Sequence, residues 1–373
     1  MDLVVPRVSS LVLLLLLLFP AFHGWALEFV VNGVAGEAKR NLEVFLGSRL
    51  RRLPDNETAA QRRVEKVGGE ALRAVGYYQP QFEVKRLADQ QWQVDVVAGK
   101  PVLIDQLRIE VSGEAADDPD VTRYLRRLPL HTGDRLHHGQ YENIKLNLQA
   151  LAAQRGFFDG QLLTRQLDVD MASSTASIHI HFASGARYRF GTINIQGSHI
   201  DELQVRRLLR LQSGQAFDVS TLSDANQRLA RSQWFELSRV TPRRGDAAAL
   251  DIPVDIDLSP RLANNIETKL GWATDTGPRL GLAWNKPWIN SAGHSLSTEI
   301  EWSTVKKTAE AAYRIPGNDP LDDYYEIAIG GEQVDNNDTD SRSYSLQLGR
   351  HSEWGDWLRS YTLRWLHEDF VQA

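Results

Sequence analysis

The sequence predicts three small α+β repeats followed by the N-terminal part of an antiparallel transmembrane β-barrel. Two observations predict this fold. A short glycine-aromatic-aromatic stretch recurs at intervals of about 80 residues, which indicates a repeated domain. From about residue 263 onward, helical periodicity gives way to alternation of apolar and polar residues, which indicates strands.

The recurring stretch appears twice in full and once in a weaker form, and each copy closes a helical segment and opens a strand. Glycine after a helix can take the left-handed conformation that ends it. The two aromatic residues alternate in direction, so one of them should enter the core between helices and sheet. We interpret the stretch as structural, although the third copy has no glycine and its turn geometry stays open. Its residues are Gly76, Tyr77, Tyr78, Gly156, Phe157, Phe158, Gln233, Trp234 and Phe235.

Each repeat reads as β-α-α-β-β, and helices are expected on one face of its sheet only. An exposed edge of such a sheet can accept an extended segment by β-augmentation. The expected domains are residues 27–102, 103–187 and 188–260 for the three repeats, and 261–373 for the incomplete barrel.

The last third contains seven alternating runs, which fit about seven strands of roughly ten residues, the dimension of a transmembrane β-strand. Tryptophan and tyrosine near the strand ends are typical of an aromatic girdle, and small or polar residues between them suit a wet lumen. The alternative is a soluble β-sandwich, whose strands also alternate. Seven strands cannot close a typical bacterial barrel, so we expect either that the barrel is cut within this sequence or that another chain completes it.

Residues 1–26 read as a secretory signal peptide. Arg7 precedes the apolar run of residues 11–19, and small residues at 24 and 26 favour cleavage after Ala26. An uncleaved anchor is the alternative, but the run is short for a bilayer span. The chain has no cysteine, which excludes a disulfide framework and a thiol nucleophile. Its formal net charge of −6 provides no general attraction for nucleic acid.

With its leader, three repeats and barrel-like strands, the chain resembles the TamA family, the outer-membrane subunits of translocation and assembly modules. This family belongs to the superfamily of outer-membrane assembly factors with POTRA (polypeptide-transport-associated) domains. The glycine-aromatic turns carry the resemblance, together with the opening strand at residues 190–197 and the loop at residues 213–217. The count of three repeats separates this family from general assembly factors, which carry more, and from two-partner transporters, which carry two.

The resemblance implies a sixteen-strand barrel whose first and last strands meet at a weak lateral seam. It also implies a TamB-like partner in the periplasm and inner membrane, and outer-membrane protein clients such as autotransporters. The chain would then lie in the outer membrane, in contact with its lipid, with the POTRA domains in the periplasm. The family's barrel-loop motif, an Arg-Gly-aromatic sequence on a long loop, has no counterpart in the barrel-like residues up to Ala373.

Other polar patterns favour ordinary structural explanations. His179 and His181 share one strand face, which metal binding would allow, but they more simply face water beside a buried strand face. The acidic run of residues 117–120 fits a helix N-terminal cap. The arginines near residues 206–210 and 243–244 could meet lipid headgroups, but they are explained by a solvated helix face and a hairpin tip. No nucleophile or phosphate-binding motif occurs, so we predict no enzymatic activity, no cofactor and no metal.

The predicted function is therefore insertion or translocation of β-barrel proteins, in which a client strand pairs with the edge of the barrel. Unpaired backbone groups are costly in lipid, and pairing removes that cost. The predicted client edge is the first barrel strand, with the residues Ile266, Thr268, Leu270 and Trp272. The alternative is a two-partner secretion pore that exports a polypeptide through the barrel. A third possibility is a surface-linked enzyme or adhesin with the repeats as a spacer.

Overall fold

The computed structural model describes residues 27–372 except 275–276 and 337–338. The predicted signal peptide, residues 1–26, lies outside the described residues. The contacts among the described residues form two compact units, one within residues 27–111, 122–148 and 162–182, and one within residues 112–121, 149–161 and 183–372. Among the described helices, none is both long and apolar enough to cross a membrane.

The first repeat has the predicted β-α-α-β-β order. The strand β1 pairs in parallel with β3, which lies at the centre of the sheet, and β2 pairs with β3 in antiparallel fashion. Alternate residues of β3, beginning at Trp92, are buried against the helices. The elements are β1 (Glu28–Asn32), α1 (Gly36–Arg49), α2 (Glu57–Ala74), β2 (Gln81–Ala88) and β3 (Gln91–Val97).

The second repeat has the same sheet order, β4-β6-β5. Its α3 begins at Pro119 and ends at Leu125. Ile178 and Ile180 of β6 are buried, as the alternation predicted. The elements are β4 (Leu103–Ser112), the short 3-10 helix η1 (Glu114–Asp117), α3 (Pro119–Leu125), α4 (His138–Gln154), β5 (Gln161–Asp170) and β6 (Thr175–Ala183).

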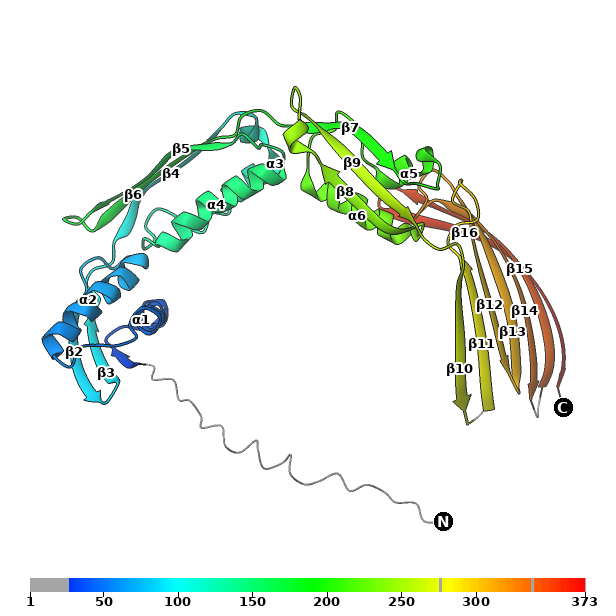
Figure 1. Cartoon of the computed structure of the whole chain (residues 1–373), viewed down its shortest axis with the longest axis horizontal. Helices are drawn as coiled ribbons and strands as arrows, with labels where there is room; N and C mark the ends of the chain where they lie inside the picture. The colour runs from blue at the N-terminus through cyan, green and yellow to red at the C-terminus, as the bar shows by residue number, and fades with distance from the viewer. Residues whose placement is uncertain (1–26, 275–276, 337–338, 373) are drawn as a thin grey trace, which may run out of the picture. The chain divides into compact units, whose positions relative to one another are not determined.

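The third repeat again places its last strand in the middle, in the order β7-β9-β8. Asp218 caps α6, because its carboxylate accepts a hydrogen bond of 2.8 Å from the backbone N–H of Ser220. Figure 1 shows α6 on one side of this sheet and α4 on one side of the second sheet. The elements are β7 (Arg189–Gln196), α5 (Glu202–Leu209), α6 (Val219–Ser232), β8 (Phe235–Pro242), η2 (Arg244–Asp246) and β9 (Asp251–Pro260).

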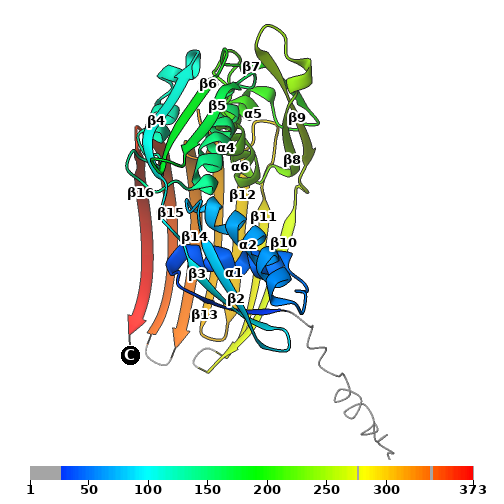
Figure 2. The same ribbon diagram turned by 90° about the vertical axis from the view of Figure 1, so that its left-hand side faces the viewer.

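The last third forms one seven-stranded sheet, in which each strand pairs in antiparallel fashion with the next along the chain. Figure 2 shows these strands side by side. The predicted number of strands is confirmed. The strands are β10 (Asn265–Ala273), β11 (Gly277–Lys286), β12 (Ser295–Ser303), β13 (Lys306–Pro316), β14 (Tyr324–Asn336), β15 (Thr339–Trp354) and β16 (Trp357–Gln372).

The last two strands have 16 residues each, longer than the predicted ten. The prediction counted only the apolar alternation, and this alternation marks one band of the strand rather than its whole length. Polar residues continue the pairing beyond that band, as in the pairs Arg342–Asp369 and Ser343–Glu368. Strand length is therefore set by the hairpin, while the apolar band occupies only its middle.

The two faces of this sheet differ in polarity. The register places Leu282 opposite Thr268 on one side and Ile300 on the other, so apolar side chains gather on a single face. That face is uncovered, and Leu270 is 85% exposed. A sandwich would bury such a face under a second sheet, and no second sheet covers it in the described part of the chain. An exposed apolar face of this kind fits the transmembrane barrel.

Candidate functional site

The first strand of the large sheet is an edge strand. Among the described residues, β10 pairs with β11 only, so one row of its backbone N–H and C=O groups has no strand partner. The four predicted client-edge residues all lie on the apolar face and are exposed, and Trp272 is 77% exposed. They are Ile266, Thr268, Leu270 and Trp272. An unpaired strand of this kind can be extended by another strand.

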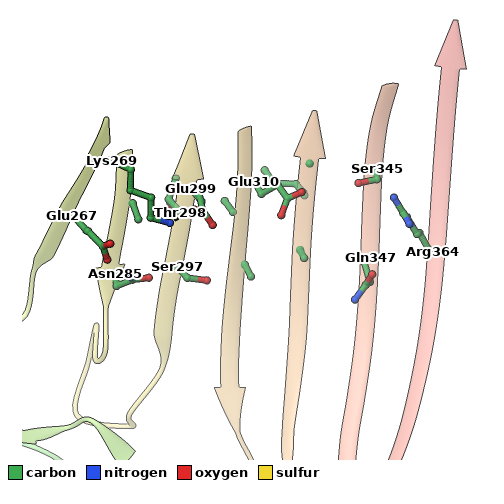
Figure 3. A pocket seen from close by; sticks show the side chains of 16 residues that line it. Glu267, Lys269, Asn285, Ser297, Thr298, Glu299, Glu310, Ser345, Gln347 and Arg364 are labelled. Carbon is green, nitrogen blue, oxygen red and sulfur yellow. Dashed lines mark hydrogen bonds and ion pairs between the residues drawn. The ribbon is translucent and has the colours of Figure 1, made fainter. Parts of the chain in front are cut away.

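The opposite face of the sheet is concave and polar. It contains a groove of about 440 Å³, whose lining residues come from β10 to β16. Figure 3 shows Glu267 and Lys269 at the edge-strand side of this groove and Arg364 at the other side. The Lys269 ammonium donates a hydrogen bond of 2.7 Å to Glu299 on β12. This lining suits a water-filled lumen.

The recurring glycines lie where one repeat meets the next. Gly76 and Gly156 both have φ of +88°, the left-handed region that favours glycine. The carbonyl of Gly76 accepts a hydrogen bond of 2.9 Å from the N–H of Val102, the residue before β4. A Cβ at Gly76 would lie within 3.0 Å of the Leu136 carbonyl oxygen, which belongs to the backbone of the second repeat. Glycine is therefore needed here for close approach as well as for its φ angle.

Gly156 makes the same joint with the third repeat. Its carbonyl accepts a hydrogen bond of 3.0 Å from the N–H of Tyr188. A Cβ at Gly156 would lie 2.8 Å from the Cβ of Phe217, in the loop before α6. The N–H of Phe217 in turn donates to the carbonyl of Tyr188 at 2.9 Å, as the N–H of Leu136 does to Val102 in the repeat before. The two joints thus share one hydrogen-bonding pattern.

The second aromatic of each turn reaches into the following repeat. Tyr78 packs against the core of the second repeat, and its hydroxyl lies 2.6 Å from Nε2 of His138 on α4. Phe158 packs against the core of the third repeat, with its ring edge-to-face on Phe217 at a centroid distance of 5.0 Å. The first aromatics differ, since Tyr77 packs against the first repeat's core and Phe157 is buried. The second aromatic of each turn therefore contributes to the core of the following repeat, whereas the sequence indicated only that one aromatic enters the core of its own repeat.

The third copy of the turn keeps its geometry without glycine. Gln233 has φ of +58°, so a residue with a side chain takes the left-handed conformation. Trp234 and Phe235 are both buried in the third core. The neighbour of this turn is the loop between β11 and β12, where a Cβ at Gly293 would overlap the Trp234 ring. Here the glycine that permits close contact is Gly293, in the loop of the large sheet, whereas in the first two copies it is the glycine of the turn itself.

A buried charge cluster lies beside the second joint. The Asp118 carboxylate is almost fully buried and accepts hydrogen bonds from the N–H groups of Asp120 and Val121 and from Arg155 at 3.0 Å. Arg155 also pairs with Asp218, the cap of α6. Burial acts to raise the pKa of Asp118, but the hydrogen bonds from Arg155 and from the α3 backbone outweigh it and lower the pKa. The sequence identified Asp118 as a cap but gave no signal for the arginine, which lies 37 residues away.

A second charge cluster joins the third repeat to the large sheet. Asp319, in the turn between β13 and β14, is buried and receives hydrogen bonds from Arg210 at 2.7 Å and from Arg228. Arg228 is itself buried, and its Nε donates to the carbonyl of Leu208 at 2.6 Å. Burial acts to raise the pKa of Asp319, but hydrogen bonds from the Leu321 N–H and the two arginines hold it below its usual range.

An aromatic contact supports the same junction. The indole N–H of Trp288, in the loop after β11, donates to the carbonyl of Arg261 at 2.9 Å. Its ring lies 4.3 Å from that of His199 in the third repeat, centroid to centroid. The N–H of Asp201 donates to the carbonyl of Ser291 at 2.8 Å. The loop between β11 and β12 is therefore fixed on the third repeat, as is the turn between β13 and β14 that holds Asp319, which the sequence could not indicate.

The other polar patterns take structural positions. His179 lies 3.5 Å from Glu110 on the neighbouring strand β4. Arg206 pairs with Glu202 one helical turn earlier, and Arg243 pairs with Asp255 on β9. Among the described residues, no group of three or more histidine, aspartate or glutamate side chains is placed to hold a metal ion.

Comparison with known proteins defines the class of these repeats. Residues 28–97 match a family model described as "POTRA domain TamA domain 1". Residues 188–261 match the POTRA model described as "Surface antigen variable number repeat". The chain thus contains POTRA domains followed by a barrel-type sheet. Proteins of this class lie in the outer membrane with their POTRA domains in the periplasm, and the chain is assigned the same location.

Two solved structures are similar to this chain. The crystal structure of BamA from Haemophilus ducreyi lacking POTRA domains 1–3 has a TM-score of 0.56 at 16% identity, over 72% of this chain and 52% of that chain. CdiB from Acinetobacter baumannii has a TM-score of 0.42 at 14% identity, over 83% of this chain and 61% of that chain. The chain spans about half the length of the BamA structure, and the similarity to BamA supports the fold of the partial barrel.

Proposed function

We propose that the chain is part of an outer-membrane assembly factor that helps insert or translocate β-barrel proteins. The observation that carries the proposal is the edge strand β10, which combines an unpaired backbone row with exposed apolar side chains on a membrane-type face. In the hydrocarbon of a bilayer, each unpaired backbone group costs several kcal/mol. A client strand that pairs with β10 satisfies both its own groups and those of the edge.

The POTRA repeats are proposed to bind the client or a periplasmic partner and to hold it near the sheet. Their outer strands β1, β2, β4, β5, β7 and β8 are sheet edges that can accept an extended segment by β-augmentation, although the first residues of β4 and β7 already pair with a loop of the same repeat. The joint at Gly76 and the cluster at Asp319 support this role, because the first fixes the first repeat on the second and the other fixes the third repeat on the large sheet. The proposal assigns no enzymatic step to the chain.

The match of the first repeat to a TamA domain model supports a more specific proposal. The chain would be the outer-membrane subunit of a translocation and assembly module, with a TamB-like partner and autotransporters among its clients. The proposed domains are residues 27–102, 103–187 and 188–260 for the repeats and 261–373 for the part of the barrel.

Site-specific photocrosslinking to a stalled client barrel tests the proposal in the whole protein. A photoreactive residue replaces Ile266 or Thr268 at the edge, and Ile300 or Ile329 in the middle of the same apolar face serves as the matched control. Client adducts are expected at the edge positions and not at the control positions. Equal adducts at both, or none above background at the edge, would contradict the proposal.

A two-partner secretion pore is the second candidate, favoured by the polar groove on the concave face. In that case the client crosses the lumen and contacts the groove rather than the edge. Photocrosslinkers at Gln347, which lines the groove, would then capture the client, and purified protein in planar bilayers would conduct ions.

A further inference from the structure

We propose that Glu267 sets the register of the incoming client strand by pairing with a lysine or arginine on that strand. The inference rests on the proposed function and names the kind of strand that β10 accepts. Such a strand alternates apolar residues toward lipid with polar residues toward the groove, and it carries a basic residue at the groove-facing position opposite Glu267.

The first step of the argument is the charge pattern along the groove side of β10. Glu267 and Lys269 face the groove, and both line it. Lys269 is already paired, because its ammonium reaches across β11 to Glu299 on β12. In the described part of the chain Glu267 has neither an ion pair nor a side-chain hydrogen bond, and it is exposed. Lys269 attracts the Glu267 carboxylate electrostatically, but it makes its ion pair with Glu299, so no cation among the described residues is in contact with Glu267.

The second step explains why the sheet itself does not supply that counter-charge. The β11 residues directly opposite Glu267 and Lys269 are Ala283 and Gly281, which have no charge. Gly281 leaves room for the Lys269 side chain, whose Cβ lies 3.2 Å from the position of a Cβ on that glycine. The small residues let Lys269 cross to Glu299, and they leave Glu267 available to a strand on its open side.

The third step is the electrostatics of the groove near the edge. Glu299 lies directly opposite Glu310 on β13, so two carboxylates of the neighbouring strands face each other. Within the described part of the chain, only Glu299 of these two forms an ion pair, and its partner is Lys269. A basic side chain on the client is therefore attracted to this part of the groove, whereas an acidic one opposite Glu267 is repelled.

The pairing also predicts a sequence direction. In an antiparallel pair, the client residue opposite Thr268 comes immediately before the residue opposite Glu267. That preceding residue faces lipid and is apolar, and the residue before it lies opposite Lys269 and is neutral or acidic. The preferred client segment thus places an apolar residue directly before the basic one.

Disulfide capture measures the register directly, because the chain has no natural cysteine. The whole protein, carrying Thr268→Cys, is placed in membranes. An eight-stranded outer-membrane barrel, translated in vitro, is added as the client. The terminal strand of this client has one groove-facing position set to Arg, Gln or Glu, and a single cysteine is moved along it. Capture should peak for the cysteine directly before the arginine, and it should weaken with Gln and further with Glu.

Charge reversal then separates register from general attraction. Glu267→Lys should lower capture of the Arg client about two- to fivefold, the effect of a cross-strand ion pair. The Glu client should regain that yield with the Glu267→Lys protein. Glu310→Lys makes the same charge change three strands farther into the sheet and is the matched control, with less than about a third of the effect. The heat-dependent gel mobility of each variant confirms that the barrel is folded.

The outcomes distinguish this inference from the proposed function. If the Arg, Gln and Glu clients are captured equally, or if charge exchange does not restore capture, Glu267 does not set the register, although β10 still accepts a strand. If no client is captured at Thr268→Cys at any cysteine position, the proposed function fails as well.

Discussion

The substitution Gly76→Ala tests whether the recurring glycine is a joint between repeats or only a helix end. An alanine at φ of +88° costs about 1–2 kcal/mol for the left-handed backbone. The new Cβ would also overlap the backbone carbonyl of Leu136, which cannot rotate away as a side chain could, and this adds about 1–3 kcal/mol. The expected total loss in the free energy of unfolding is about 2–5 kcal/mol.

The matched control is Gly133→Ala in the second repeat. Gly133 has φ of +92°, but a Cβ there meets nothing within 4 Å, so only the backbone cost of about 1–2 kcal/mol applies. Residues 27–187 contain a single tryptophan, Trp92, whose ring is buried in the first repeat. Urea unfolding of this segment, monitored by Trp92 fluorescence and circular dichroism, gives the free energy of unfolding of each of the two variants. If Gly76→Ala and Gly133→Ala lower the free energy of unfolding by amounts that agree within about 0.5 kcal/mol, Gly76 does not act as a joint between the repeats.

Three further predictions follow from the charge clusters and the sheet faces. Asp118→Asn should cost about 3 kcal/mol, because it leaves the half-buried Arg155 and Arg187 without their buried carboxylate partner. The lowered pKa of Asp118 means that its contribution is complete above the unfolded pKa of about 4 and is lost as the pH falls through the native pKa. The difference in the free energy of unfolding between wild type and variant should therefore narrow as the pH falls from 7 to 3, and a constant difference would contradict this role of Asp118. Arg228→Ala and Asp319→Ala should each speed hydrogen exchange in the β13–β14 turn and in α6. The double variant should reveal a coupling energy of about 1–3 kcal/mol between the two residues. If the effects of the two substitutions simply add, the pair does not hold the junction. Leu346→Arg on the apolar face should destabilise the folded protein in lipid vesicles by about 2–4 kcal/mol, whereas Gln347→Arg on the groove face should change it by less than about 1. Similar urea midpoints for these two would show that the apolar face does not contact lipid.

Local pattern predicted the fold because each element is specified by nearby residues. The alternation at Ile178 and Ile180 fixed the buried face of β6, and the seven apolar runs fixed the strands of the large sheet. The left-handed conformation of Gln233 escaped prediction, because the conformation of a non-glycine residue there depends on its tertiary neighbours. A polar side chain can occupy this position where the following segment leaves space.

The contacts between repeats could not be predicted, because they join residues far apart in the sequence. Arg228 and Asp319 are separated by 91 residues, and each looks like an ordinary surface charge in its own segment. The unpaired state of Glu267 likewise depends on Ala283 and Gly281, whose role appears only once the register is known. The edge position of β10, by contrast, followed from its place as the first alternating run.

Client insertion by variants with proline in the edge strand tests the central claim most directly. Successive N–H groups of β10 point alternately toward β11 and toward the open edge, and proline removes the N–H at its position. Of the adjacent variants Thr268→Pro and Lys269→Pro, one should disrupt the sheet and the other should leave it folded. The account predicts that the folded variant inserts a client barrel at least about tenfold more slowly than wild type, because a backbone group of the client stays unpaired in lipid. A folded proline variant that inserts clients at the wild-type rate would contradict it.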